Sequence, residues 1–431
     1  MFRGTNSVTN GSLGKFDPTG LANDTYTLRL TAVDTNGHSS SLDREINVAG
    51  DLKLGNFRLS FTDISIPVTG IPITLSRTYD SLTAGDREDF GYGWRMEFRD
   101  TDLRISLKKD EFYDQLGYRT VGFQDGDRVY LTLPGGKREG FTFQARRIQS
   151  SYNQVFGGRF YYPSFVADQG VTSTLSVPGA QYVDNSASNS FSSGGSGNPN
   201  NILIRDLNGK LVNLGGRRYR PEDEGFGNQY VLTSKDGTKY TINATTGKLE
   251  QVADTNGNTL SYTDSEIKSS TGVSVSFERD AQGRITSVSD PKGGLVRYGY
   301  DSNGDLVSVT DRDGNTTGFV YDGVRVHFLD QIIDPLGRAA VRTEYDENGR
   351  LKKSANSAGN GVEFSYDPLN SIETIKDALG NPTTFEYDTR GNVVTEVDAL
   401  GGITRRTYDD DNNLLSETDA EGRTIAYTYD S

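Results

Sequence analysis

A Tyr-Asp dipeptide that recurs at a near-constant interval constrains this chain more than any other feature. The tyrosines are followed by aspartate at spacings of 21, 24, 21, 21, 21 and 21 residues, and the longer interval marks a three-residue insertion. They are Tyr300, Tyr321, Tyr345, Tyr366, Tyr387, Tyr408 and Tyr429. A fixed period of this length indicates a repeat architecture in which each unit packs mainly against its neighbours.

Each unit contains two turns. An acidic residue follows the Tyr-Asp aspartate by ten positions, as Asp311 follows Asp301 and Asp398 follows Asp388. About six residues of extended chain then lie between turns, which is the usual strand length. Aspartate at the first position of a type I turn accepts backbone hydrogen bonds, and glycine at the fourth tolerates a positive φ. The predicted turn residues are Asp301, Gly304, Asp311, Gly314, Asp388, Gly391, Asp398 and Gly401.

The strands before the turns predict one apolar face. Phe385 and Tyr387 are two apart and so share a face, and the same spacing recurs in neighbouring units. An apolar residue lies five after the aspartate, as in Leu306, Ile372 and Val393. The predicted wall aromatics are Tyr300, Tyr321, Tyr345, Tyr366, Tyr387 and Tyr408. We expect them to line the inner surface of a curved sheet, with a sugar-binding stripe as the alternative.

Composition supports an all-β chain and excludes several classes of function. The 431 residues include 50 Gly, 23 Tyr and 20 Phe, with an apolar fraction of only 33%. A net charge of −14 opposes binding to a nucleic-acid backbone. The absence of cysteine excludes disulfides and thiolate chemistry and leaves the redox compartment undetermined. We find neither a signal peptide nor an apolar run long enough to span a membrane, and interpret the first residues as the start of a fragment.

The expected organisation has four parts. Residues 1–49 form a partial β segment, and residues 50–183 form an opening module with further strands. Residues 184–201, rich in Ser, Gly and Asn, are expected to form a flexible loop. Residues 202–431 hold the repeat array, whose first weak unit begins near residue 228.

The repeats and the opening motifs resemble a known family. Tyr-Asp dipeptides at this period, with Glu347 to Leu351 and Ser289 to Gly293, resemble the YD repeats of bacterial Rhs proteins, Tc-toxin shell subunits and teneurins. Residues 51–95 resemble the Rhs opening module through Asp63 to Pro67, Arg77 to Ser81 and Gly91 to Trp94. Leu21 to Ser41 resembles the last two strands of an immunoglobulin-like module, which cannot close its own sandwich.

The resemblance implies a fold and a role. YD-repeat hairpins would form a spiralling, curved β-sheet, the open part of a hollow shell that encloses a C-terminal toxin. The implied partners are that cargo or the remainder of the shell, and the implied location is secreted or on the bacterial cell surface. The alternative is an adhesion module that binds a surface glycan or receptor. We also expect association through the sheet edge near Tyr427, because an unpaired strand can pair with another chain.

Candidate chemistry is weak throughout. Asp-rich turns such as Asp254 to Asn258 offer too few oxygen ligands for calcium, and turn capping explains them better. Any two repeat aspartates could be proposed as a glycosidase pair, so such a pair carries little information. His38 lies in the first segment, and alternation predicts that His327 is a strand residue. Trp94 is predicted to be a core anchor. We therefore predict no catalytic residue, metal or cofactor, and no enzymatic activity.

Overall fold

The prediction of an all-β protein is confirmed. The computed structural model describes residues 16–48, 52–97, 99–107, 120–133, 137–148, 159–178 and 201–429. These residues form antiparallel strands and two short 3-10 helices, η1 (Ser81–Thr83) and η3 (Glu224–Phe226). Residues 184–200 of the predicted flexible loop lie outside the described residues.

One long antiparallel sheet of 21 strands dominates the fold. Its strands follow one another along the chain and join neighbours by tight turns, apart from the first strand, β12 (Thr174–Ser176), which pairs with β15. The others are β15 (Gln229–Thr233), β16 (Lys239–Asn243), β17 (Leu249–Ala253), β18 (Thr259–Tyr262), β19 (Glu266–Ser269), β20 (Ser274–Arg279), β21 (Ile285–Ser289), β22 (Leu295–Tyr300), β23 (Leu306–Thr310), β24 (Thr316–Tyr321), β25 (Leu329–Ile333), β26 (Ala339–Tyr345), β27 (Leu351–Ala355), β28 (Gly361–Asp367), β29 (Ile372–Lys376), β30 (Pro382–Tyr387), β31 (Val393–Val397), β32 (Ile403–Tyr408), β33 (Leu414–Thr418) and β34 (Thr424–Ala426).

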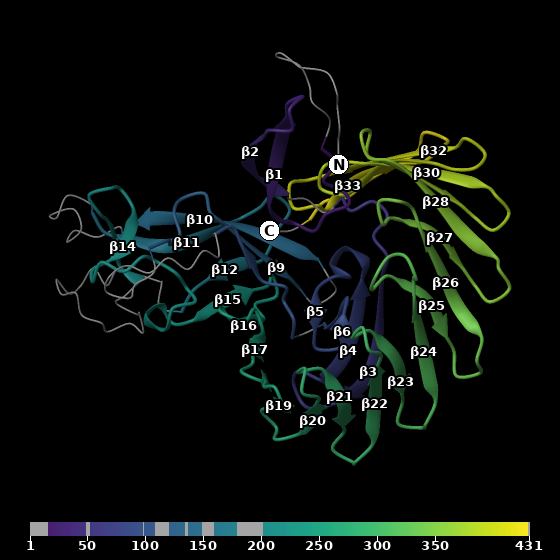
Figure 1. Cartoon of the computed structure of the whole chain (residues 1–431), viewed down its shortest axis with the longest axis horizontal. Helices are drawn as coiled ribbons and strands as arrows, with labels where there is room; N and C mark the ends of the chain where they lie inside the picture. The colour runs from purple at the N-terminus through teal and green to yellow at the C-terminus, as the bar shows by residue number, and fades with distance from the viewer. Residues whose placement is uncertain are drawn as a thin grey trace.

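The long sheet bends into an arc. Figure 1 shows its strands passing from β15 around to β33, with β3 to β6 on the inside of the curve. In six hairpins the first strand ends at a tyrosine or an arginine, and the pairing register shifts immediately before that residue, as between Gly299 and Tyr300. Bulges of this kind bend a strand and increase its twist, so a regularly repeated bulge accounts for the curvature.

A six-stranded sheet lies beside the beginning of the long sheet. It is ordered β14-β13-β11-β10-β9-β8. Its strands are β8 (Arg104–Ile105), β9 (Arg128–Thr132), β10 (Arg138–Arg147), β11 (Tyr161–Ala167), β13 (Leu203–Arg205) and β14 (Leu211–Asn213). The repeat array therefore does not begin at residue 202 as predicted, because β13 pairs with β11 and β14 pairs with β13, which places both strands in the six-stranded sheet. The repeat strands begin at Gln229.

Smaller sheets come from the first quarter of the chain. β3 (Arg58–Ile66), β4 (Ile73–Asp80) and β7 (Trp94–Met96) form one sheet, and β5 (Arg87–Glu88) pairs with β6 (Gly91–Tyr92). β1 (Asp24–Val33) and β2 (Ser39–Val48) form a separate hairpin that is mostly exposed. Among the described residues, no helix has the length and apolar character needed to cross a bilayer.

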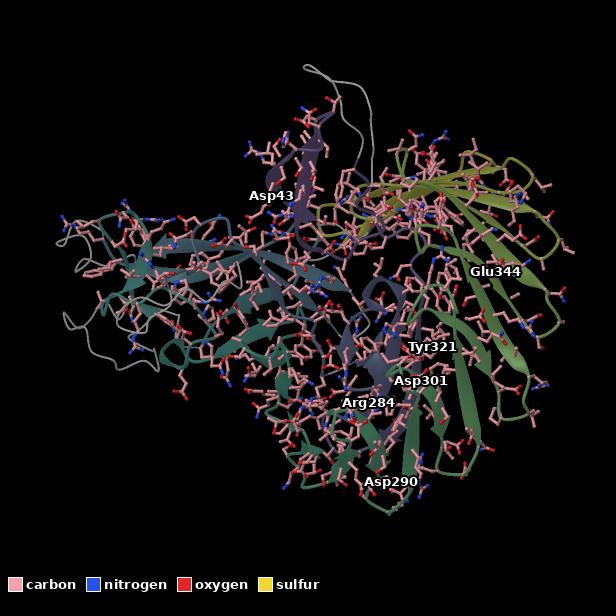
Figure 2. All side chains as sticks on the ribbon, in the orientation of Figure 1. Asp43, Arg284, Asp290, Asp301, Tyr321 and Glu344 are labelled. Atoms are coloured by element: carbon pink, nitrogen blue, oxygen red, sulfur yellow. The ribbon has the colours of Figure 1, made fainter. Side chains whose placement is uncertain are left out.

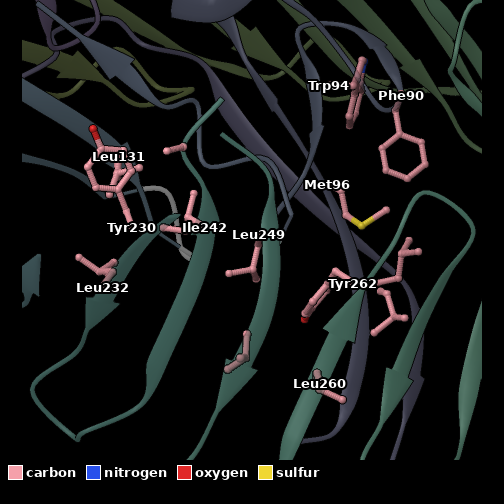
Figure 3. Packing of buried hydrophobic residues seen from close by; sticks show 14 of the residues in the cluster. Phe90, Trp94, Met96, Leu131, Tyr230, Leu232, Ile242, Leu249, Leu260 and Tyr262 are labelled. Carbon is pink, nitrogen blue, oxygen red and sulfur yellow. The ribbon is translucent and has the colours of Figure 1, made fainter. Parts of the chain in front are cut away.

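The core fills the inside of the arc. A single hydrophobic cluster joins β3, β4 and β7 to the long sheet and to the six-stranded sheet. Figure 3 shows Trp94 and Met96 of β7 on one side of it and Leu249 and Tyr262 of the long sheet on another. Trp94 is fully buried, with 0% of its surface exposed. We call the face of the long sheet turned toward this core the inner face.

Candidate functional site

The predicted turn residues share one geometry. In the first turn, the N–H of Gly304 donates to the carbonyl of Asp301 at 3.2 Å, and the N–H of Asp301 donates to the carbonyl of Asp305 at 3.0 Å. The Asp301 carboxylate accepts from the N–H groups of Asn303 and Asp305, both at 2.9 Å. Gly304 has φ +92°. The result is a type I turn followed by a one-residue bulge, in which the carboxylate satisfies two backbone donors.

The other predicted turns repeat this arrangement. Each aspartate accepts from the N–H groups two and four residues ahead, in the turns that begin at Asp311, Asp388 and Asp398. The glycines Gly314, Gly391 and Gly401 have φ of +87°, +88° and +84°. The carboxylates are thus engaged by their own turns.

The turns alternate between two rims of the sheet. We define the tyrosine rim as the turns that begin at Asp301, Asp322, Asp346, Asp367, Asp388 and Asp409, and the opposite rim as those that begin at Asp290, Asp311, Asp334, Asn356, Asp377, Asp398 and Asp419. Figure 2 shows Asp290 and Asp301 at the two ends of β22.

The repeat tyrosines form a hydrogen-bonded ladder. The Tyr321 hydroxyl donates to the carbonyl of Leu306 at 2.9 Å, fifteen residues earlier, and Tyr300 donates to Ile285 at 2.5 Å. Tyr345, Tyr366, Tyr408 and Tyr429 donate to Leu329, Leu351, Val393 and Leu414. Tyr321 ends β24 and Leu306 begins β23, and the turn that joins these two strands lies at the opposite rim. At the tyrosine rim the hydroxyl therefore links two strands that no turn connects there. Burial raises the pKa of Tyr300 and of Tyr321, which keeps both hydroxyls protonated as donors.

Tyr387 departs from the ladder. Its hydroxyl donates to Glu373 Oε2 at 2.7 Å instead of to a backbone carbonyl. The pairing of β28 with β29 has no register shift, so Tyr366 lies opposite Glu373 and Asp367 lies opposite Ile372. Glu373 therefore occupies the inner face, and the prediction that Ile372 lies on the apolar stripe is wrong. Burial raises the pKa of the Glu373 carboxyl.

Arg77 of β4 lies at the centre of the contact between the opening segment (residues 51–95) and the inner face. Its Nε donates to Asp63 Oδ2 at 2.8 Å, and the Tyr298 hydroxyl donates to the same oxygen at 2.9 Å. The guanidinium lies 5.0 Å from the ring centre of Trp94 and 5.1 Å from that of Phe319. Burial raises the pKa of Asp63, although Arg77 opposes the shift. A buried pair of this kind is costly to break from either side.

Three further hydrogen bonds join the opening segment to the repeat wall. The indole Nε1 of Trp94 donates to the Tyr321 hydroxyl at 2.8 Å. The Tyr79 hydroxyl donates to the carbonyl of His327 and accepts from the N–H of Leu329, both at 2.9 Å. Tyr79 and Trp94 thus bind the residues around the three-residue insertion.

His327 is not a strand residue, and that prediction is wrong. It lies between β24 and β25 with φ +70°, because the insertion replaces the four-residue turn by a longer one. Its ring stacks on Tyr92 with 3.7 Å between ring centres, and Nδ1 lies 2.7 Å from Asp305 Oδ1. The histidine therefore helps to hold β6 against the tyrosine rim.

A buried ionic cluster joins β5 and the residues after β7 to the beginning of the long sheet. Asp89 contacts Arg279 at 2.5 Å, Lys248 at 3.2 Å and Arg99 at 3.6 Å. Although burial alone would raise it, these three cations hold the pKa of Asp89 below its usual value. Asp100 lies 3.5 Å from Lys248, and burial together with the charge of Asp89 raises its pKa to about 6.

The cover provided by the N-terminal part of the chain extends to β27. The Arg350 guanidinium donates to the carbonyl of Leu54 at 3.2 Å and pairs with Asp17. The N–H of Leu351 donates to the carbonyl of Gly55 at 2.9 Å. Gly55 has φ +77°, and a Cβ there would lie 2.5 Å from the Arg350 side chain.

Beyond β27 the inner face changes in character. Tyr366, Tyr387 and Tyr408 are half-buried, whereas Tyr345 is only 9% exposed. An open cavity of about 580 Å³ lies at the boundary and is lined in part by Tyr366.

Charged residues replace aliphatic ones in this half of the inner face. Glu396 lies opposite Phe385 in the register, where the covered part has Val309 opposite Tyr298. Arg406 contacts Glu396 at 3.0 Å and Glu417 at 2.8 Å. The uncovered inner face is therefore polar as well as aromatic.

The long sheet returns to its own beginning. The Gln169 amide donates to Asp410 Oδ1 at 2.8 Å, and the Asn412 amide donates to the carbonyl of Gly170 at 3.4 Å. Gly170 has φ +81°, and a Cβ there would lie 2.3 Å from the Asn412 amide. The hairpins were expected to form the open part of a shell, yet the last turns of the described sheet contact the loop that leads into its first strand.

Among the described residues, no three His, Asp or Glu side chains are grouped so that they could hold a metal ion. The acidic side chains described above instead accept hydrogen bonds within turns, as Asp301 does, or form ion pairs at the opening segment, as Asp63 and Asp89 do.

Two family models match the chain. The model described as RHS Repeat matches residues 300–325, 366–403 and 408–431, which contain six of the seven predicted Tyr-Asp tyrosines and all of the predicted turn residues. A domain of unknown function, DUF6531, matches residues 51–122, which include the opening segment. No curated protein matches the chain.

Solved structures of Tc toxins are similar to the chain at low identity. A crystal structure of TcdB2-TccC3 is 9% identical with a TM-score of 0.29, over 94% of this chain and 26% of that one. The same complex without its hypervariable C-terminal region is 11% identical with a TM-score of 0.28, over 82% and 20%. The Tc holotoxin pore of Photorhabdus luminescens is 12% identical with a TM-score of 0.26, over 74% and 20%. This chain therefore spans about a fifth to a quarter of the chains it matches.

Proposed function

Because the chain is an RHS-repeat protein, we propose that it is a non-enzymatic part of the wall of a hollow β-shell that encloses a C-terminal toxin or effector. The observation that carries the proposal is the division of the inner face. The opening segment seals one half, and the other half presents Tyr366, Tyr387 and Tyr408 half-buried beside charged residues.

The polar character of the uncovered half supports containment. A polypeptide held against a continuous apolar face would adhere to it, because each buried apolar side chain contributes about 1.5 to 3 kcal/mol. Glu396, Arg406 and Glu417 interrupt that face with an ionic network. The wall would therefore separate its cargo from solvent without binding it tightly. We propose the remainder of the shell as the second partner, and a secreted or cell-surface location.

The test is protection of a cargo. A protease-sensitive, unfolded polypeptide is fused after Ser431, and its digestion is compared with that of the free polypeptide. We expect slower digestion in the fusion. Arg350→Ala should speed it, because this residue fastens the cover through Leu54. Arg423→Ala is the matched control, since Arg423 also lies four residues after a turn aspartate but is exposed. Equal digestion of fused and free polypeptide would reject containment.

A glycan or receptor as the main partner is the alternative outcome. If the protein binds a glycan array, and Tyr366→Ala or Tyr387→Ala removes that binding while the fused cargo is digested freely, the chain is an adhesion module. A hydrolytic activity that one Asp→Asn substitution abolishes would instead indicate an enzyme.

A further inference from the structure

The opposite rim carries a row of exposed leucines. Leu336, Leu379 and Leu400 occupy the third position of their turns and are 76%, 87% and 97% exposed. Their turns are held by aspartates, so the leucine side chains take no part in forming them. Solvent-facing leucines at equivalent positions of several turns form a repeated apolar feature of this rim.

The tyrosine rim carries exposed apolar residues over the same stretch of sheet. Val324 and Val326, in the turn between β24 and β25, are 84% and 66% exposed. Leu369, in the turn between β28 and β29, is 59% exposed.

One interval is common to both rows. The valine turn and the Leu369 turn are four strands apart. Leu336 lies between β25 and β26 and Leu379 between β29 and β30, which is again four strands. At about 4.8 Å per strand both intervals are roughly 19 Å. Consider two copies of the sheet in the same orientation, with the tyrosine rim of one against the opposite rim of the other. If one copy is shifted by one strand, Leu336 meets Val324 and Val326, and Leu379 meets Leu369.

A contact within the chain already joins these two kinds of rim. Asp410 and Asn412 belong to the tyrosine rim, and they contact Gln169 and Gly170. That loop leads into β12 at Thr174, which pairs with Thr233. Thr233 precedes the turn that begins at Ser234, and because turns alternate along the sheet this turn lies at the same end of the strands as the opposite rim. Where the sheet meets itself, the tyrosine rim therefore contacts the loop that enters the long sheet from the side of the opposite rim.

We propose that a second copy of this chain docks its tyrosine rim on the leucine row of the opposite rim. The contact is heterologous, so each copy leaves one rim of each kind free and further copies can add head to tail. This surface lies at the turn tips and is separate from the β34 edge strand, although Leu369 also lines the open cavity beside Tyr366. It also extends beyond containment, because it concerns how walls join rather than what they enclose.

Cysteine cross-linking tests the geometry, since the natural chain has no cysteine. Leu379→Cys and Leu369→Cys copies are mixed and oxidised at micromolar concentration, each in an Ile425→Lys background that blocks pairing through β34. We expect mixed disulfide dimers to exceed the dimers formed by either variant alone by several-fold. Predominant Leu379→Cys homodimers, or no excess of the mixed species, would overturn the proposal.

Charge substitution supplies an independent measurement. Leu379→Lys alone and Leu369→Glu alone should each sediment as monomers, and their mixture should recover the dimer. Leu207→Lys is the matched control, because Leu207 is a fully exposed turn leucine in the six-stranded sheet and lies on neither rim. If Leu379→Lys associates as strongly as the Leu207→Lys control, the leucine row is not the docking surface. Turn tips tolerate such changes, and unchanged circular dichroism confirms that each variant is folded.

Discussion

The indole nitrogen of Trp94 donates a 2.8 Å hydrogen bond to the hydroxyl of Tyr321, which lies 227 residues further along the chain. The same hydroxyl donates to the carbonyl of Leu306 at 2.9 Å. One buried oxygen thus belongs both to the ladder that joins the repeat hairpins and to the contact that holds the opening segment in the arc.

Tyr321→Phe is therefore expected to destabilise the protein more than loss of an ordinary ladder bond. It removes both hydrogen bonds of the Tyr321 hydroxyl and leaves the Trp94 N–H buried without an acceptor, at a cost of about 2 to 3 kcal/mol. Tyr408→Phe, the half-buried control, should cost about 0.5 to 1 kcal/mol. Urea unfolding followed by fluorescence of Trp94, the only tryptophan, measures both. Equal costs would show that the indole contact contributes nothing.

Two turn glycines should differ in their tolerance of a side chain. Gly304→Ala and Gly314→Ala both force alanine to positive φ, which costs about 1 to 2 kcal/mol. A Cβ at position 304 also lies 3.1 Å from the Tyr92 ring, whereas position 314 is open. We expect a larger drop in melting temperature for Gly304→Ala. The excess should disappear in a Tyr92→Ala background, and its persistence there would refute the steric explanation.

The turn aspartates should make the protein sensitive to acid. Hydrogen bonds from the asparagine four residues ahead lower the pKa of Asp311, Asp377 and Asp409. A carboxyl whose folded pKa lies below its unfolded value stabilises the fold above about pH 4 and loses that contribution as the pH falls further. Replacing all three by asparagine should lower stability at pH 7 and narrow the difference from wild type below about pH 4. A constant difference across the titration would contradict this.

Asp100, unlike the turn aspartates, should make the folded protein more stable as the pH falls. Its pKa is raised to about 6 by burial and by Asp89, so its charge opposes folding at neutral pH and protonation relieves the cost as the pH falls through 6. Lys248 and Arg99 face it as partial compensation. The urea midpoint of the wild-type protein should therefore rise when the pH is lowered from 7.5 to 5. Asp100→Asn keeps an acceptor for the Met96 N–H, and in this variant the rise in urea midpoint should be smaller. An unchanged rise would assign it to other groups.

The β34 edge should pair with other chains at high concentration. β34 is exposed along its length and is the last strand in the order of the long sheet. Amide hydrogen exchange at residues 424–427 should slow as concentration rises, and Ile425→Lys should remove that dependence because edge lysines oppose strand pairing. Exchange that does not depend on concentration would count against edge pairing.

The sequence predicted the local structure of the repeats well because each turn is specified by residues a few positions apart. Asp301 and Gly304 determine one hairpin without reference to the rest of the chain, and the period carries that information along the array. The prediction for Ile372 is wrong where a turn lacks the usual glycine, and the prediction for His327 is wrong where the insertion lengthens the period. Ser371 has φ +56° in the turn after Asp367, and the insertion lengthens the turn before β25. Neither register can be read from alternation alone.

The contacts of the opening segment were beyond sequence reasoning. Asp63 and Arg77 stood out only as motif positions, and nothing in their spacing indicated that Tyr298 would share their ion pair.

By itself the sequence determined an all-β chain of hairpins with an aromatic face, because turn chemistry and strand alternation act over short distances. Only the tertiary structure decided which part of that face is covered, where Glu373 and Arg406 interrupt it, and that Asp410 meets Gln169 across the arc. These features depend on curvature accumulated over many strands and on packing between residues hundreds of positions apart, and no local pattern in the sequence encodes either.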